Sequence, residues 1–462
     1  MRLIHSLGNA LAATALASAL LLPQASRADD AKSFAMGMIP PGHVMLPDGE
    51  PSANVFLISG AAGWGDAEQT EAQALVDKGA AVVGIDFPAY MKTLAADDGD
   101  CVYMISDIEA LAHQVQRAGG ATSYAPPILA GIGEGGALAL AMISQSPAAT
   151  IGQAIAVDPV AGIPLKKILC TPAEKTVAGD RTIYAFTDGE LPAPVTVLFT
   201  GKADQAGKDH VAQLTAKHAE VDSRSVDGAA GDALAKILSD QVDAAGDADD
   251  PLGLPISVLD AKPVMDTMAI VFSGDGGWRD IDKEVGGVLQ QQGIPVVGLD
   301  SLKYFWSERK PQETADDLAR IIDAYRKQWD VQHVLLVGYS FGADVMPATY
   351  NLLSDQDKAR VPQITLMALS HEVDYEVSVD GWLGVSSSEG KPDPVNDIAK
   401  LDPGLVQCIY GKDEDEDACP TLKDKGVEVI GLDGGHHFDG DYQALGLRII
   451  DALKGRLAKQ KT

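Results

Sequence analysis

Short apolar runs alternate with longer amphipathic segments along the second half of the chain. The runs have the length of strands, are mostly aliphatic, and cover residues 268–272, 295–299, 333–337, 364–368, 407–410 and 427–432. Strand-length apolar runs separated by helical segments are typical of a parallel sheet that helices cover on both faces. The pattern therefore predicts an α/β fold for this half.

Two of the intervening segments have the period of a helix that packs on a sheet. Their apolar residues recur every three or four positions and so share one face of a helix. These residues are Leu318, Ile321, Ile322 and Tyr325 within 314–329, and Leu445, Ile449, Leu453 and Leu457 within 442–457.

The first half repeats motifs of the second half at a nearly constant spacing. Residues 59–66 read Ser-Gly-Ala-Ala-Gly-Trp-Gly-Asp, and 214 positions later residues 273–280 read Ser-Gly-Asp-Gly-Gly-Trp-Arg-Asp. A Gly-Ile-Gly-Glu-Gly motif at 131–135 matches Gly-Tyr-Ser-Phe-Gly at 338–342, an offset of 207. Because motif order is kept and only loop lengths change, we predict two tandem copies of one α/β fold.

The length of 462 residues fits two domains of roughly 200 residues each. A segment of small and acidic residues near the middle has no apolar period and resembles a linker. We predict a signal peptide at 1–28, a first domain at 29–245, the linker at 246–253 and a second domain at 254–462.

The first residues have the order of a secretory signal. Arg2 precedes an apolar stretch at 11–22, and Ser26 and Ala28 supply small residues before the expected cleavage site. The apolar stretch is shorter than the roughly 20 residues that span a bilayer. We therefore expect cleavage after Ala28 and export.

Export makes disulfides an expected feature of the four cysteines, two of which lie in each half. We expect Cys101 to pair with Cys170 and Cys408 with Cys419; free buried thiols are the alternative. The second bridge would brace the acidic loop between its cysteines.

The formal net charge is −30, and loss of Arg2 and Arg27 with the signal would make it −32. This charge disfavours nucleic acid as a partner. An acidic surface attracts a cationic headgroup or metabolite, although charge of this size can also serve solubility alone.

Ser340 lies in the setting of a nucleophile elbow. Residues 334–337 form a predicted strand, 338–342 a glycine-rich turn, and the chain from 343 onward a helix. Small residues flank the Ser of such an elbow because the turn is strained and its neighbours approach closely. We predict that Ser340 is the nucleophile of an α/β-hydrolase; the alternative is a glycine turn with an idle Ser.

A nucleophilic Ser needs a base, which in this fold follows an acid in chain order. The loop at 433–439 follows the last predicted strand and holds His436 and His437. We prefer His436, which directly follows two glycines, and assign His437 as a supporting hydrogen-bond partner. A metal site is the alternative, but no third ligand lies at a suitable spacing.

The acid is expected just after the run at 407–410, where Asp413, Glu414 and Asp415 are adjacent. Glu414 occupies the common position three residues after a glycine, but the sequence leaves the choice among the three open. Several of these carboxylates must be solvated, because close like charges cannot all be buried.

An oxyanion hole in this fold uses the N–H of the residue after the nucleophile, here Phe341, and a second N–H from an earlier loop. The loop at 273–278 contains three glycines, so we expect Asp275 or Gly276 to donate; a plain turn is the alternative. Asp275 and Asp344 would also place negative charge near Ser340 and favour a cationic substrate. Asp344 could instead offset the dipole of its helix.

The first half lacks these groups. Gly133 stands where the second half has its Ser, and Ala230 and Gly231 stand opposite the two His. Asp204 remains, opposite Glu414. A copy without nucleophile and base cannot perform triad chemistry, so we expect a role in binding, docking or stabilisation.

The second half carries a combination of motifs that is specific to one family. They include Phe-Ser-Gly-Asp-Gly-Gly-Trp and Gly-Trp-Leu-Gly, and they lie at 272–278, 297–306, 337–344, 381–384 and 435–442. Together they resemble the VirJ and AcvB family of bacterial virulence proteins over nearly the whole second half. The first half resembles the degenerate repeat of the longer AcvB-type members.

The resemblance implies a periplasmic α/β-hydrolase that cleaves the aminoacyl ester of lysyl-phosphatidylglycerol, needs no cofactor, and acts on this aminoacylated phospholipid at the membrane surface. In plant-associated relatives it also implies a link to type IV secretion and DNA transfer. Two alternatives differ from this reading: an esterase or acyl transferase for another ester, and a non-catalytic secretion partner with a vestigial Ser site.

Overall fold

The computed structural model describes residues 34–246, 251–377 and 390–460. The predicted signal peptide at 1–28 lies outside the described residues, as does the family motif at 381–384. Within the described part, no helix combines the length and apolar character needed to cross a membrane.

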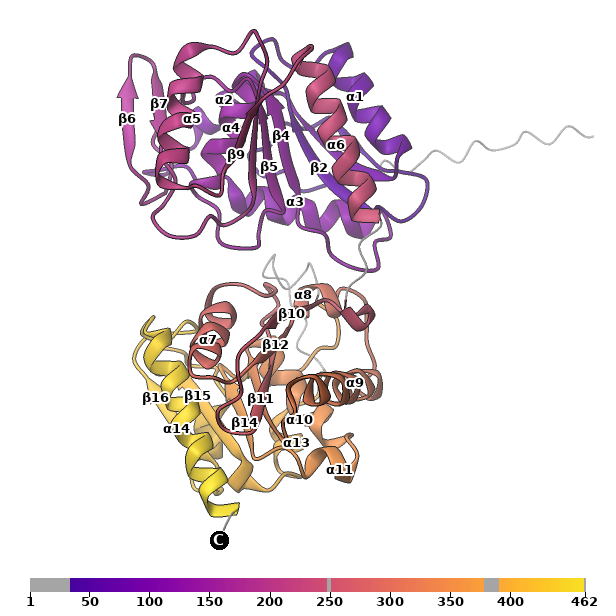
Figure 1. Ribbon diagram of the computed structural model, residues 1–462, viewed down its shortest axis with the longest axis vertical. Helices are drawn as coiled ribbons and strands as arrows, with labels where there is room; N and C mark the ends of the chain where they lie inside the picture. Colours follow the sequence, from indigo (N-terminus) through magenta and orange to yellow (C-terminus); the bar gives the residue numbers. More distant parts are fainter. Residues whose placement is uncertain (1–33, 247–250, 378–389, 461–462) are drawn as a thin grey trace, which may run out of the picture. The chain divides into compact units, whose positions relative to one another are not determined.

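The first half contains a seven-stranded sheet that is parallel except for its first strand (Figure 1). In spatial order its strands are β1 (Val44–Met45), β3 (Ala80–Ile85), β2 (Ala53–Ile58), β4 (Ile128–Ile132), β5 (Gln153–Val157), β8 (Val195–Phe199) and β9 (Asp222–Ser225). Its helices are α1 (Asp66–Asp77), α2 (Phe87–Ala96), α3 (Ile105–Ala118), α4 (Glu134–Ile143), α5 (Gln205–Lys217) and α6 (Ala230–Gly246). An antiparallel hairpin, β6 (Lys175–Ala178) and β7 (Arg181–Tyr184), forms a separate small sheet.

The second half repeats this topology strand for strand. Its sheet runs β10 (Ile256–Leu259), β12 (Val296–Leu299), β11 (Thr267–Phe272), β13 (His333–Tyr339), β14 (Gln363–Met367), β15 (Val406–Gly411) and β16 (Glu428–Leu432), with only β10 antiparallel. Its helices are α7 (Asp280–Gln291), α8 (Ser301–Tyr304), α9 (Pro311–Trp329), α10 (Phe341–Asn351), α11 (Asp355–Lys358), α13 (Val395–Ile398) and α14 (Tyr442–Gln460). Short 3₁₀ turns lie at Pro251–Gly253, Pro403–Leu405 and Cys419–Leu422. The predicted fold of two tandem, mostly parallel α/β domains is confirmed.

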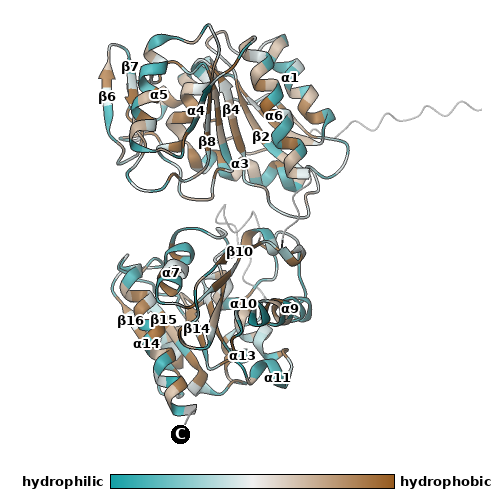
Figure 2. Ribbon diagram, viewed as in Figure 1, coloured by the Kyte–Doolittle hydropathy of each residue, from teal (hydrophilic) through white to brown (hydrophobic). Residues whose placement is uncertain are grey.

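Alternation along β11 explains how helices cover both faces of the second sheet. Ala269 and Val271 pack in the cluster that holds α7 and α14, whereas Met268, Ile270 and Phe272 belong to the cluster that holds α9. Successive strand residues point to opposite faces, so a strand buried on both sides is apolar over most of its length. Figure 2 accordingly shows the central strands of both halves as largely hydrophobic and the helices as mixed.

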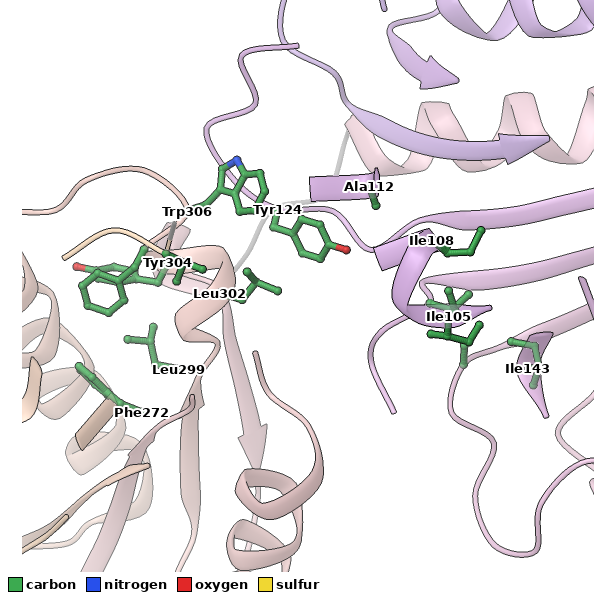
Figure 3. Packing of buried hydrophobic residues seen from close by; sticks show 14 of the residues in the cluster. Ile105, Ile108, Ala112, Tyr124, Ile143, Phe272, Leu299, Leu302, Tyr304 and Trp306 are labelled. Atoms are coloured by element: carbon green, nitrogen blue, oxygen red, sulfur yellow. The ribbon is translucent and has the colours of Figure 1, made fainter. Parts of the chain in front are cut away.

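The carboxyl ends of the central strands carry the buried residues that support the site. Phe272, Leu299, Leu302 and Tyr304 lie at the ends of β11 and β12 and on α8, and Figure 3 shows these side chains from close by. All four are at most 4% exposed. In α/β sheets, ligands bind at this carboxyl edge.

The predicted linker at 246–253 begins within a helix, because α6 runs to Gly246. Ala244 and Ala245 are strong helix formers, and the buried Val242 anchors the last turns to the sheet. Residues 251–253 form a 3₁₀ turn, and 247–250 lie outside the described residues.

Candidate active site

Ser340 occupies a sharp turn between β13 and α10. Its backbone angles are φ 50° and ψ −121°, a strained region for a residue with a side chain. The turn fits because Gly338 and Gly342 have no side chains: a Cβ on Gly342 would lie 2.2 Å from the carbonyl oxygen of Phe272. The sequence therefore folds into an elbow that presents Ser340 at the carboxyl edge of the sheet.

His436 contacts Ser340. The His436 Nε2 atom lies 2.9 Å from Ser340 Oγ, and Nδ1 lies 3.0 Å and 3.1 Å from the two carboxyl oxygens of Glu414. The Tyr339 hydroxyl donates a hydrogen bond of 3.2 Å to the carbonyl oxygen of His436 and so holds the loop. Ser340, His436 and Glu414 form one hydrogen-bonded chain, which is the arrangement that activates a serine hydroxyl.

The acidic loop separates its three adjacent carboxylates. Glu414 is half-buried and points to His436, whereas Asp413 and Asp415 are exposed to solvent. The N–H of Asp413 donates to the carbonyl oxygen of Gly434 at 2.9 Å, which ties the acidic loop to the loop of His436. Of the three residues left open by the sequence, the structure thus brings Glu414 to the base.

His437 lines the same cavity but lies beside the chain of hydrogen bonds. Its ring centroid is 6.1 Å from that of His436 and 6.2 Å from that of Tyr339. Among the described residues, no group of three or more His, Cys, Asp or Glu is arranged to hold a metal ion.

Each half contains one disulfide. Cys101 bonds to Cys170, and Cys408 bonds to Cys419. The second bridge spans only 11 positions and closes the loop that contains Glu414. It therefore restricts the segment that carries the carboxylate.

A small cavity of about 140 Å³ lies in front of Ser340. The residues at 274–277 form one wall of it, and their loop is fixed by two carboxyl groups. The N–H of Gly274 donates to Asp282 Oδ2 at 3.4 Å. Gly277 has a φ of 83° and packs against the Asp300 carboxyl, and a Cβ added at Gly277 would lie only 2.9 Å from Asp300 Oδ1. Asp275 and Gly276, the residues expected to provide the second N–H donor, thus lie at the cavity.

The other expected donor, the N–H of Phe341, lies in the first turn of α10. Phe341 is the first residue of α10, and first-turn N–H groups have no acceptor within their own helix. At the cavity, burial raises the pKa of the Asp275 carboxyl, while the nearby Arg279 and His436 and hydrogen bonds from the N–H groups of Asp275 and Gly276 lower it. These two N–H groups therefore lie where they can stabilise negative charge.

Burial changes the charge that Asp344 was expected to carry. The pKa of Asp344 is raised to about 8, mainly by desolvation; the Ser370 N–H, which donates at 2.8 Å, lowers it, and the nearby Asp275 and Asp417 add to the rise. Asp344 is therefore mostly protonated at pH 7 and does not supply the fixed negative charge that the sequence predicted. Burial also raises the pKa of Asp417, to about 6, but this carboxyl stays mostly ionised at pH 7.

The first half lost the whole segment that holds the base, not only its side chain. In the second half, residues 433–441 separate β16 from α14, whereas residues 226–229 alone separate β9 from α6. Ala230 and Gly231 are helical and do not correspond structurally to His436 and His437, which corrects the alignment by sequence offset. Asp204 is the N-cap of α5 and accepts a hydrogen bond of 3.3 Å from the Gly207 N–H, so it has a capping role.

Four cavity or site residues were missed from the sequence: Arg279, Tyr339, Asp282 and Asp417. The repeat contained a signal for the first two, because the first half has Gly65 opposite Arg279 and Ile132 opposite Tyr339. A polar residue in the second half whose equivalent in the first half is nonpolar therefore points to the site around Ser340.

A comparison with known protein families finds a match in the second half of the chain. Residues 266–457 match the family described as Bacterial virulence protein (VirJ). A comparison with curated proteins finds no match.

Several solved structures resemble one half of the chain. Est1E from Butyrivibrio proteoclasticus with bound ferulic acid is 11% identical, with 46% of this chain and 98% of that chain covered and a TM-score of 0.30. XC6422 from Xanthomonas campestris, described as a serine hydrolase without a lid, is 18% identical over 45% and 91%, with a TM-score of 0.28. The esterase EaEST from Exiguobacterium antarcticum is 12% identical over 45% and 98%, with a TM-score of 0.32. At these TM-scores the likenesses carry no argument about activity.

Proposed function

We propose that the second half of this chain, in which residues 266–457 match the VirJ family, acts as a serine hydrolase that removes the aminoacyl group from lysyl-phosphatidylglycerol. The observation that carries the proposal is the hydrogen-bonded chain from Ser340 through His436 to Glu414 at the cavity. Such a chain is suited to attack on an ester carbonyl.

The reaction would proceed in two halves. Ser340 Oγ attacks the ester carbonyl while His436 takes its proton, and His436 then gives that proton to the departing glycerol hydroxyl of phosphatidylglycerol. Water next attacks the lysyl-Ser340 ester with His436 as base, which releases lysine and restores the serine. Glu414 keeps the His436 ring oriented and stabilises its positive charge.

Charge at the developing oxyanion would be met by backbone N–H groups of Phe341 and of the loop at 275–276. Each such donor contributes about 10² to 10³ in rate in serine hydrolases. The Asp275 carboxyl now shares these amides, so it must turn away when the oxyanion forms. A lysyl ammonium in the cavity would draw it away and lower its pKa.

We also propose where in the cell the reaction takes place. The N-terminal sequence pattern supports export, and the substrate resides in a membrane, so we place the reaction at the periplasmic face of the inner membrane. The family resemblance extends this to a link with type IV secretion.

The proposal is tested with purified protein and vesicles that contain lysyl-phosphatidylglycerol. Wild type should release lysine, and Ser340→Ala should release it at least about 10³-fold more slowly. A fluorophosphonate probe should label wild type and leave Ser340→Ala unlabelled. Equal lysine release by both proteins would contradict the role of Ser340.

The two outcomes of labelling separate the alternatives. Labelling at Ser340 without lysine release would favour an esterase or acyl transferase for a different ester. Absence of both labelling and release would favour the non-catalytic secretion partner.

A further inference from the structure

The first half contains a cavity of about 170 Å³ at the place where the second half has its catalytic cavity. Four of the residues that line it occupy equivalent positions in the repeat. The pairs are Gly60 and Gly274, Ala67 and Ile281, Glu68 and Asp282, and Ile132 and Tyr339. The degenerate copy has therefore kept the hollow at the carboxyl edge of its sheet while losing the catalytic groups.

Helix α6 reshapes this cavity. Because the loop before α6 is short, the first turns of the helix reach the cavity, and Gly231, Asp232, Leu234 and Ala235 line it. In the second half the same side is formed by His436 and His437. A helix face that is apolar except for Asp232 thus replaces the two polar rings.

The lining combines an apolar floor with acidic groups. Leu57, Ile58, Ile132 and Leu234 supply the floor, and Glu68, Glu71 and Asp232 are acidic; no Lys, Arg or His is among the described residues that line it. Glu68 is partly engaged, since it accepts a hydrogen bond of 3.0 Å from the Gly65 N–H. Glu71 is half-buried, burial raises its pKa, and within the described chain no hydrogen bond or ion pair of its side chain is found.

Helix dipoles do not account for all of this negative charge. Helices α1 and α6 both begin near the cavity, and each N-terminus contributes about half a positive charge. Glu68 and Asp232 lie in the first turns and offset that charge. Glu71 lies further along α1, beyond the turn where the dipole acts, so its carboxylate is surplus.

From this combination we propose that the first half binds a primary ammonium group carried on a short alkyl chain. Glu71 is its main anionic partner, Asp232 adds to the field, and the apolar floor contacts the alkyl chain. Apolar pockets with a few polar groups are the usual form of small-molecule sites. This site is separate from Ser340 and does not depend on the proposed hydrolysis.

The experiment uses the full mature chain and three probes of one length: hexylamine, hexanol and hexanoate. By isothermal titration at pH 7.5, hexylamine should bind at least fivefold more tightly than hexanol, and hexanoate should not bind. Glu71→Gln should weaken hexylamine about fivefold, and Glu71→Gln with Asp232→Asn about twentyfold. Asp240→Asn is the matched control, because Asp240 is exposed on α6 outside the cavity and pairs with Lys236.

Two further variants locate the binding. Ala235→Leu should fill the cavity and abolish the Glu71-dependent binding of hexylamine, whereas Asp275→Asn, which alters the catalytic cavity of the second half, should leave that Glu71-dependent binding unchanged. Absence of hexylamine binding, equal affinity for hexanol, or an unchanged affinity in Glu71→Gln would overturn the proposal. Lysine release by Glu71→Gln should match wild type, so failure here is distinguishable from failure of the hydrolase proposal.

Discussion

The two elbows of this chain have nearly the same backbone but opposite chemistry. Gly133 has φ 57° and ψ −111°, and Ser340 has φ 50° and ψ −121°. The copy without a nucleophile therefore keeps the strained turn, so the strain belongs to the strand-turn-helix architecture and is not maintained by catalysis. Glycine adopts this conformation at little cost, whereas Ser340 requires support from its surroundings.

The elbows differ in what surrounds them. At Ser340, two loops bring His436 and Glu414 to the hydroxyl. At Gly133, the next residue, Glu134, forms a two-pronged ion pair with Arg181 of the β6–β7 hairpin, at 2.9 and 2.5 Å. The two halves thus share one strand-turn-helix structure, and the loops attached to it determine which half can carry out catalysis.

The largest effect is expected from the two adjacent histidines of the second half. His436→Asn should lower the rate of lysine release about 10³-fold or more, because it removes the base that contacts Ser340. His437→Asn should lower it less than tenfold, because His437 lies outside the hydrogen-bonded chain. Single-turnover kinetics on lysyl-phosphatidylglycerol would measure both; a larger loss from His437→Asn would reverse the assignment.

The acidic loop provides the next test. Glu414→Gln should reduce the rate about 10² to 10⁴-fold, since the carboxylate orients His436 and stabilises its charge. Asp413→Asn and Asp415→Asn serve as matched controls, being exposed neighbours with the same charge change, and each should retain more than half of the activity. Circular dichroism of the three variants would verify that the loop change leaves the fold intact.

Substitutions of glycine in the two elbows test whether both halves share the same strand-turn-helix structure. Gly342→Ala should lower the free energy of unfolding by about 3 kcal/mol, because its Cβ would lie 2.2 Å from the carbonyl oxygen of Phe272. Gly133→Ser should cost only about 1 to 2 kcal/mol, the strain of a side chain at positive φ, since no atom lies within 4 Å of the added Cβ.

Urea unfolding followed by fluorescence would compare the two substitutions. Gly133→Ser should also gain no esterase activity, because residues 226–229 provide no base. A Gly133→Ser variant that loses as much stability as Gly342→Ala would show that the first elbow is packed differently.

Most strands of the second half, and the two helices with an apolar period, were predictable from the sequence, because they are buried. A parallel strand covered on both faces is a continuous apolar run, and the predicted run at 268–272 became β11. Helix α9 buries Leu318, Ile321, Ile322 and Tyr325, as its period predicted. The exposed hairpin strand β6 had no such signal, since all its residues face solvent.

The site was predictable only where chain order constrains it. The positions of Ser340 and of the His loop follow from the order of elements, but the choice of Glu414 over its neighbours depends on loop conformation, which residue type does not encode. The first half shows the converse: aligning by offset placed Ala230 opposite His436, because a deletion in a loop leaves no mark on the residues that remain. The charge of Asp344 was missed for a related reason, since burial and not residue type determines it.

The smallest effect concerns Asp344, whose first-half equivalent, Ala137, carries no charge. The pKa of Asp344 is raised to about 8 in the folded protein and lies near 3.9 when unfolded, so between these values the unfolded state binds fewer protons and stability falls as pH rises. Asp344→Asn keeps an oxygen acceptor for the Ser370 N–H but cannot ionise.

Its stability relative to wild type should therefore rise by about 2 kcal/mol between pH 5.5 and 7, at roughly 1.4 kcal/mol per pH unit. Urea titrations at matched pH values would measure the difference, in which the other buried carboxyls cancel because both proteins share them. If the difference in the free energy of unfolding between the two proteins were constant across this range, Asp344 would be ionised in the folded state and would place its negative charge near Ser340.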